Sequence, residues 1–256
     1  MTNVDLLVFG PHPDDIEIGF GGSVALHVAR GFHVGLCDLT GGELGSNGTI
    51  EDRLAEAEAA RAVLGASWRV NLGWPDGGPY DTPEHLDDVV RLLRACRPEV
   101  VAIPHWNDRH PDHRAASETL SRALFKAGLR RFRPHSSPRP WLAEALARAA
   151  EAPEGTAWRP RCTCYYFIND EAPVSFGLDV SEVYEKKRQA LACHATQFTQ
   201  TGPDSVPTRL TASTFRQLIE SRDARLGALA GVAHAEGVVI REPVLRTSLF
   251  DDRGPA

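Results

Sequence analysis

The stretch VDLLVFGPHPDDIEIGFGGSVALHVARG, residues 4–31, begins with a short apolar run and ends with a segment of helical periodicity. The run VDLLVFG has the length and aliphatic content of a buried strand, and it stops at Gly10. In GGSVALHVARG the apolar side chains recur at helical spacing up to Gly31. The stretch therefore predicts a β-strand followed by an α-helix, joined by a loop that carries PHPDD.

The same alternation of strand and helix continues along the chain. Strands are expected at HVGLCDLT, VNLGW and EVVAIPH, and helices at TIEDRLAEAEAARAVLGA, TPEHLDDVVRLLRACRP and HRAASETLSRALFKAGL. Thr49 and Asp52 lie near the expected start of the first of these three helices. Thr82 is the expected N-cap of the second, with Pro83 at its first helical position. Repeated βα units predict an α/β fold with a mostly parallel sheet and helices on both faces.

The alternation lapses over residues 130–161, where Pro and Ser bracket one helical stretch, Trp141–Ala150. We expect a surface insertion or lid there. A C-terminal extension follows, with strands at CTCYYFI and near FGLDVS and helices over about 181–194 and 213–229. The length of 256 residues fits a single domain over residues 1–256.

Composition restricts the classes of partner. The net charge of −6 gives no general attraction to nucleic acid or to an anionic membrane. No segment is long and apolar enough to span a bilayer, and MTNVDLLVFG lacks a basic leader, so a cytoplasmic location is expected. Five scattered cysteines do not suggest a disulfide framework, and Cys162 and Cys164 alternate with Tyr165 as packing residues of a strand would.

Two loops carry the candidate chemistry. PHPDD follows the first predicted strand, and HWNDRHPDH follows the strand EVVAIPH. Since ligands of open α/β sheets bind outside the carboxyl ends of the strands, both loops should meet at one point. The loops contribute six titratable groups: His12, Asp14, Asp15, His110, Asp112 and His113.

Imidazole and carboxylate groups together indicate a divalent metal such as zinc, which uses three protein ligands in catalytic sites. His12, Asp15 and His113 supply such a set. A helix N-cap or a surface histidine explains single residues of this kind, but not their convergence on a ligand-binding edge.

A nucleotide-binding or non-catalytic α/β module is the alternative of a different class. The segment GFGGSVA resembles a dinucleotide-binding loop, but after Gly19 and Gly21 the third glycine of that motif falls at Val24. This alternative also does not explain why the two loops carry the motifs HPDD and HPDH.

The paired motifs PHPDD and HPDH resemble those of the LmbE/PIG-L family of zinc-dependent N-acetylglucosamine deacetylases, which have a Rossmann-like fold. DDIEIGFGG, CDLTGGELGSNGT, DRHPDH, KKRQAL and TQF, in this order, are most similar to the bacillithiol-pathway branch, the N-acetylglucosaminyl-malate deacetylases. The resemblance covers most of the chain apart from residues 130–161. It implies one Zn²⁺ per chain, a small-molecule N-acetylglucosaminyl substrate and a homo-oligomer, and the same ligand types also suit Fe²⁺ or cobalt.

The resemblance also implies residue roles. His12, Asp15 and His113 would hold the metal, and Asp14 would be the general base that later protonates the leaving amine. His110 would donate to the oxyanion, with Asp112 orienting its ring and favouring the imidazolium form.

For the rest of the substrate, Arg53 and Arg109 match positions that resemble substrate-binding arginines and can bind a malate carboxylate. Arg53 taken alone would also pass as a solvated helix residue. At His194, in ACHATQF, the branch carries a tyrosine whose hydroxyl can help the oxyanion; a histidine can also donate there, or be purely structural. Gln197 is expected near the pocket.

Three polar residues of GGELGSNGT, Glu43, Ser46 and Asn47, follow the second strand and are candidates for contacts with sugar hydroxyls, or simple turn formers. The function implied is removal of acetate from N-acetylglucosaminyl-malate. The alternative within the family is another N-acetylglucosaminyl compound, such as a chitooligosaccharide or an inositol conjugate. A pocket built around arginines should reject neutral sugars, because they leave buried cations unpaired.

Overall fold

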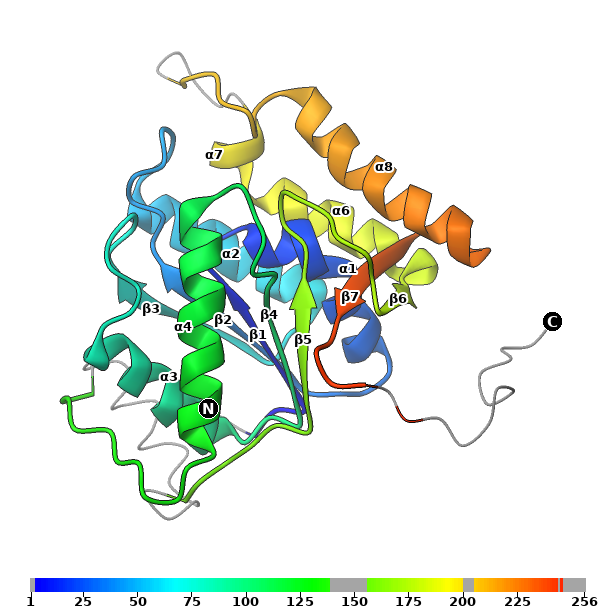
Figure 1. The fold of residues 1–256 in the computed structure, drawn as a ribbon. Coiled ribbons are helices and arrows are strands. Elements are labelled where there is room, and N and C mark those ends of the chain that lie inside the picture. The colour runs from blue at the N-terminus through cyan, green and yellow to red at the C-terminus, as the bar shows by residue number, and fades with distance from the viewer. Residues whose placement is uncertain (1–2, 139–155, 200–204, 244, 246–256) are drawn as a thin grey trace.

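The structure is a computed structural model that describes residues 3–138, 156–199, 205–243 and 245. A seven-stranded sheet with the order β3-β2-β1-β4-β5-β7-β6 runs through these residues (Figure 1). Its strands are β1 (Leu6–Gly10), β2 (Val34–Thr40), β3 (Trp68–Trp74), β4 (Val100–Pro104), β5 (Cys162–Tyr166), β6 (Phe176–Asp179) and β7 (Ala235–Val239). Strands β1 to β5 are parallel to one another, and β7 runs antiparallel to β5 and β6. The predicted mostly parallel α/β sheet is confirmed, and its strand order reverses between β1 and β4, as in a Rossmann fold.

Helices cover both faces of the sheet, as predicted (Figure 1). One face carries α3 (Pro83–Cys96) and α4 (Pro111–Ala127). The other face carries α1 (Asp15–Ala29), α2 (Ile50–Leu64), α6 (Tyr184–Cys193) and α8 (Ser213–Ala230). A 3₁₀ turn, η1 (Ser181–Val183), precedes α6, and a short helix, α7 (Ala195–Phe198), follows it.

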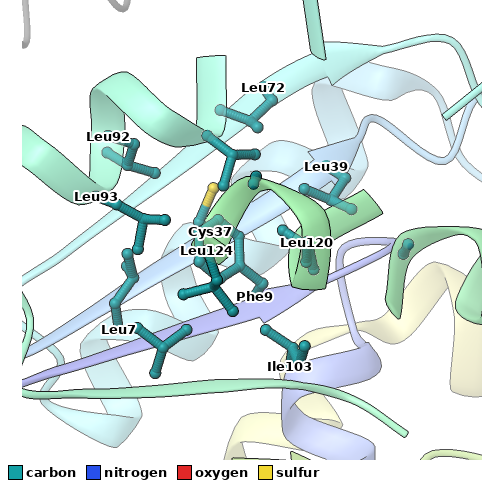
Figure 2. Close-up of a cluster of buried hydrophobic side chains, with 14 of the residues drawn as sticks. Leu7, Phe9, Cys37, Leu39, Leu72, Leu92, Leu93, Ile103, Leu120 and Leu124 are labelled. Carbon is teal, nitrogen blue, oxygen red and sulfur yellow. The ribbon is translucent and has the colours of Figure 1, made fainter. Parts of the chain in front are cut away.

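The strand period of two divides the apolar side chains of β1 between the two cores. Leu7 and Phe9 pack toward α3 and α4, and Figure 2 shows this cluster. Leu6 and Val8 pack on the opposite face. All five residues of β1 are buried, which is typical of the central strand of a parallel sheet.

The predicted helix caps are confirmed. The Thr49 hydroxyl accepts a hydrogen bond from the Asp52 N–H in a capping box, and Thr82 caps α3 through the His85 N–H. Gly65 ends α2 with φ +80°, a left-handed conformation that favours glycine.

The prediction was wrong about the start of the first helix and did not include two elements. Helix α1 begins at Asp15 rather than in GGSVAL, so its glycines lie inside the helix. Strand β7 was not predicted because Glu236 and Gly237 interrupt its apolar pattern, and α7 has only four residues.

The described C-terminal end of the 130–161 segment packs beside the amino end of β4, whereas the predicted site lies at the carboxyl ends of the strands. The indole N–H of Trp158 donates to the Pro98 carbonyl, and the Arg161 N–H donates to the Glu99 carbonyl, just before β4 begins. The predicted helical stretch Trp141–Ala150 lies outside the described residues, so its role as a lid stays a prediction.

Close packing of α1 on β5 requires glycine at position 19. A Cβ atom on Gly19 would overlap the carbonyl oxygen of Phe167 and the ring of Tyr166. By contrast, a Cβ atom on Gly21 would meet its nearest neighbour, Cγ of Lys187, at 3.3 Å.

We expect Gly19→Ala to destabilise the protein by about 1–3 kcal/mol, because the overlapping atoms are backbone and a buried ring. Gly21→Ala, its matched control in the same helix, should change stability by less than about 1 kcal/mol. Urea unfolding of both variants measures the difference. Equal stabilities would contradict the packing argument.

A buried lysine joins α1, α6, α8 and β7. The Lys187 ammonium donates to Asp223 Oδ2 and Glu236 Oε1, each at 2.6 Å, and all three side chains are almost fully buried. Glu236 also accepts the N–H groups of Gly22 and Ser23 on α1. Burial raises the pKa of Asp223, but Lys187 and Arg222 lower it more, so that the net shift is downward.

Lys187→Met should destabilise the metal-free protein by about 3–5 kcal/mol at pH 7, because it leaves two buried carboxylates without a cation. Since the folded-state pKa of Asp223 is lowered, the wild-type contribution is present above the ordinary Asp pKa and is lost as pH falls below about 4. The stability gap between wild type and variant should therefore narrow in acid. Urea unfolding at pH 7 and at a pH below about 4, with chelator present, measures the difference in stability between wild type and variant. Lys186→Met, at an exposed lysine, is the control. A stability difference that does not depend on pH would refute the prediction.

Candidate metal-dependent active site

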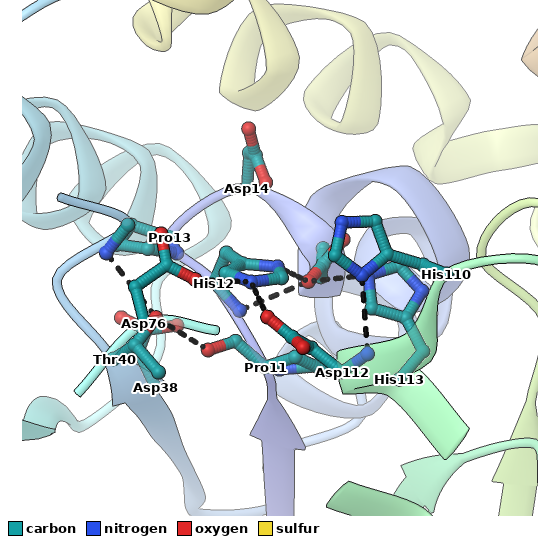
Figure 3. A network of polar contacts seen from close by, with 12 residues as sticks. Pro11, His12, Pro13, Asp14, Asp38, Thr40, Asp76, His110, Asp112 and His113 are labelled. Atoms are coloured by element: carbon teal, nitrogen blue, oxygen red, sulfur yellow. Dashed lines mark hydrogen bonds and ion pairs between the residues drawn. The ribbon is translucent and has the colours of Figure 1, made fainter. Parts of the chain in front are cut away.

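The loops after β1 and β4 meet outside the carboxyl ends of these strands, at the reversal of strand order (Figure 3). Ligand atoms of His12, Asp15 and His113 all lie within 4.8 Å of one another. Asp15 Oδ2 is the common point: it is 3.0 Å from His12 Nδ1 and 3.3 Å from His113 Nε2. The structure thus brings together the three residues that the sequence predicted as metal ligands.

The carboxylate and the two imidazoles of this group shift the pKa values of one another. Burial raises the pKa of Asp15, but His113 and His12 outweigh it, so the net shift is well below the usual range. Burial lowers the pKa of His113, yet Asp15 and Asp108 raise it to about 9. Burial also lowers the pKa of His12, but hydrogen bonds with Asp112 and Asp15 outweigh this effect, so that the net shift is upward.

Two imidazoles and one carboxylate on a buried point fit a divalent metal. The set has the donor types of catalytic zinc sites with three protein ligands, and Fe²⁺ accepts the same types. A bound cation would take the place of the protons that otherwise neutralise Asp15. His12, Asp15 and His113 are therefore the residues that would hold it.

Asp14 is buried next to this group and has an unusual backbone. Its φ of 140° lies in a region that non-glycine residues rarely adopt, and such strain is typical of functional sites. Burial raises the pKa of Asp14 to about 6, against the lowering effect of Arg53. A carboxylate with a raised pKa is suited to general-base chemistry near neutral pH.

Arg53 has a different position from the one expected. It is only 4% exposed, so it is not a solvated helix residue. Its Nη1 donates to the Gly42 carbonyl at 2.7 Å, and its Nη2 donates to the Pro13 carbonyl at 3.0 Å and to Asp14 Oδ2 at 3.3 Å. Both terminal nitrogens thus have protein acceptors, which places Arg53 behind Asp14 rather than in direct contact with a substrate.

His110 and Asp112 also differ from the expected arrangement. The Asp112 carboxylate lies against His12 Nε2 at 3.3 Å and accepts the Gly77 N–H, while Nδ1 of His110 accepts the Asp112 N–H at 3.3 Å. Burial, followed by the neighbouring His113, lowers the pKa of His110, which does not support the predicted preference for imidazolium. A neutral His110 that accepts through Nδ1 carries its proton on Nε2 and can still donate a hydrogen bond.

His194 is completely buried and faces a charged cluster beneath α1. Its Nε2 is 3.3 Å from Glu17 Oε2, and Arg69 forms ion pairs with both Glu17 and Asp38. Burial raises the pKa of Glu17, but Arg69 and His194 lower it to about 2. This position favours the structural alternative for His194 over a role as an oxyanion donor.

Among the other expected substrate contacts, Arg109 is exposed in the β4–α4 loop, and its guanidinium forms no ion pair within the described residues. Gln197 donates to the Asn47 carbonyl at 2.7 Å, and Asn47 exchanges two hydrogen bonds with Val206. Glu43 accepts the Asp76 N–H, and Ser46 is exposed. The structure therefore leaves Arg109 and Ser46 open, while Asn47 and Gln197 connect two loops.

Two carboxylates beside the histidines were missed from the sequence. Asp76 lies 3.1 Å from His12 Nε2, and Asp108 lies 3.2 Å from His113 Nδ1. Both follow the carboxyl ends of parallel strands, β3 and β4, which is the signal that would have found them.

Comparison with known proteins agrees with the site. The profile of the family described as PIG-L, GlcNAc-PI de-N-acetylase, matches residues 7–124. A 1D-myo-inositol 2-acetamido-2-deoxy-alpha-D-glucopyranoside deacetylase of Mycobacteroides abscessus is 30% identical, over 78% of this chain and 83% of its own. The chain belongs to the PIG-L (LmbE-like) family of deacetylases.

Two further similarities support this membership. A diacetylchitobiose deacetylase of Thermococcus kodakarensis is 28% identical, over 91% of this chain and 81% of its own. The crystal structure of a conserved protein from Thermus thermophilus superposes with a TM-score of 0.80 at 34% identity, over 98% of this chain and 100% of that one. Like other PIG-L deacetylases, the protein is an enzyme that hydrolyses an amide bond. Among the described residues, none of the helices combines the length and apolar character that a bilayer span needs.

We expect Asp14→Asn to lower kcat by about 10²- to 10⁴-fold, the usual contribution of a general base, while the bound metal is retained. Asn keeps the size of the side chain but cannot accept the proton. Amine release and metal content of the purified variant are the two measurements, with Asp15→Asn as the comparison that should lose metal. Turnover near the wild-type rate would exclude Asp14 as the base.

Proposed function

We propose that the protein removes the acetyl group from an N-acetylglucosaminyl small molecule, with one Zn²⁺ per chain, and that the favoured substrate is N-acetylglucosaminyl-malate. The observation that carries the deacetylase chemistry is the convergence of Asp14 with His12, Asp15 and His113 at the switch in strand order. The similarity to deacetylases of N-acetylglucosamine compounds supports the sugar.

A zinc ion bound at this site supplies a Lewis acid for the amide carbonyl and lowers the pKa of water toward about 7. Asp14 takes the proton of the attacking water and returns it to the departing amine. Arg53 holds Asp14 in place through the 3.3 Å ion pair and fixes the loops on both sides of it. His110, with its Nε2 proton, donates to the oxygen on which negative charge develops.

Arg109 carries the argument for an anionic second half of the substrate. It is exposed in the β4–α4 loop, between the site residues Asp108 and His110, and a guanidinium can bind a carboxylate with two hydrogen bonds. Because Arg53 is paired with Asp14, Arg109 is the one of the two predicted arginines that is left for this recognition.

A chitooligosaccharide or an inositol conjugate is the second candidate, and the named relatives favour it. The Mycobacteroides protein and the Thermococcus protein are named for substrates of these two kinds. Neither kind presents a carboxylate to Arg109, so the substrates can be told apart by their dependence on this side chain.

The test is release of free amine from N-acetylglucosaminyl-malate, the inositol conjugate and diacetylchitobiose. If malate is recognised, Arg109→Ala should lower kcat/KM for the malate conjugate by about 10- to 100-fold and leave the neutral substrates nearly unchanged. Arg122→Ala, which removes an arginine paired with exposed Asp81, is the matched control.

Faster turnover of a neutral sugar than of the malate conjugate would keep the deacetylase and overturn the malate assignment. No turnover of any of the three would place the substrate outside this class. The cytoplasmic location and the homo-oligomer stay predictions.

A further inference from the structure

The two histidines of the metal group each direct one ring nitrogen toward Asp15 and the other toward a different carboxylate. His12 Nδ1 and His113 Nε2 face Asp15 Oδ2, at 3.0 and 3.3 Å. The opposite nitrogens, His12 Nε2 and His113 Nδ1, therefore point away from the place where a cation would bind.

Asp76 holds the far nitrogen of His12. Its Oδ1 lies 3.1 Å from His12 Nε2, a nitrogen that it shares with Asp112 Oδ2 at 3.3 Å, and its Oδ2 accepts the Leu44 N–H at 3.0 Å. The Asp76 N–H donates to Glu43 Oε1 at 2.8 Å, so two bonds fasten this residue to the β2–α2 loop. The Asp76 side chain is only 8% exposed, and its orientation is fixed by the protein.

Asp108 holds the far nitrogen of His113 in the same way. Its Oδ1 lies 3.2 Å from His113 Nδ1 and accepts the His110 N–H at 2.8 Å. Asn169, after β5, donates its backbone N–H to Asp108 Oδ2 at 3.0 Å and its side-chain amide to Oδ1 at 3.1 Å. The carboxylate is thus aimed at the ring by groups from the two loops that follow β4 and β5.

An acceptor at the far nitrogen decides which nitrogen of a neutral imidazole keeps the proton. If a cation bound next to Asp15, each neutral ring would keep its proton on the nitrogen that faces Asp76 or Asp108. The lone pairs of His12 Nδ1 and His113 Nε2 would then be free for the cation, and the nearby negative charge would make each ring a stronger donor.

We propose that Asp76 and Asp108 are positioning residues that orient the two histidines for metal binding, and that Asp76 links this orientation to the β2–α2 loop. This inference rests on the proposed metal site at His12, Asp15 and His113. It extends that site to Asp76, on the loop after β3, and to Asp108, on the loop after β4, as residues that would hold the histidines rather than the metal.

The experiment measures the Zn²⁺ affinity of the full-length protein by competition with a chromophoric chelator. Asp76→Ala and Asp108→Ala should each weaken binding by about 10- to 100-fold, the usual effect of losing such a partner. Asp76→Asn and Asp108→Asn should weaken it less than the alanine variants, since the amide oxygen still accepts the ring N–H but carries no charge.

Asp87→Asn is the matched control. Asp87 is a buried aspartate that accepts the N–H groups of His135 and Ser136 and lies 3.7 Å from the His135 ring. Its replacement should affect stability but leave the Zn²⁺ affinity within twofold of wild type. Thermal unfolding of each metal-free variant identifies any loss of folding. Asp76 lies on a loop, so the Asp76→Ala variant tests the proposal even if Asp108→Ala does not fold.

Affinities of the folded Asp76→Ala variant within twofold of wild type would overturn the proposal, provided that the wild type binds one Zn²⁺ and Asp15→Asn does not. Wild-type protein that binds no Zn²⁺ would instead overturn the proposed function itself. A fall in affinity for Asp87→Asn as large as for Asp76→Ala would also refute the positioning role, because it would reflect general destabilisation.

Discussion

Carboxylates crowd together at the edge of the sheet where β1, β3 and β4 end, and the site depends on how their mutual repulsion is balanced. The five residues are Asp14, Asp15, Asp76, Asp108 and Asp112. The negative groups make the point attractive to a cation, and the protein supplies part of the compensation through two histidines and Arg53. A bound metal ion would complete it. The group that binds the metal and the group that moves protons can therefore lie on adjacent residues.

The start of two helices positions these carboxylates. Helix α1 begins at Asp15, so a metal ligand lies in its first turn, and α4 brings Asp112 and His113 into its own first turn. Positive partial charge at both helix N-termini stabilises carboxylates there. Two buried ion pairs hold α1 on the sheet. Arg69 pairs with Glu17 of α1, and Lys187 pairs with Glu236, which accepts the N–H of Gly22 in α1. The position of the ligands thus depends on charges far from the substrate.

The same residue type has opposite roles on the two sides of the site. Arg53 is buried, and its terminal nitrogens are used by Asp14 and two backbone carbonyls, whereas Arg109 is exposed and available. His194 is likewise part of the scaffold beneath α1, although its sequence position resembles a substrate-facing one. The variety of substrates named for relatives agrees with substrate recognition by loop residues, which vary more readily than the sheet.

The sequence by itself determined the parallel sheet, the helix caps at Thr49 and Thr82, and the three metal-ligand candidates, because periodicity, capping and loop motifs are local along the chain. Only the tertiary structure decided that Arg53 supports Asp14, and that Asp76 and Asp108 stand behind the histidines. Apart from Asp108 and His113, these pairs are separated by tens of residues, and whether a charged side chain is buried against a partner or free in solvent depends on contacts that no local pattern encodes.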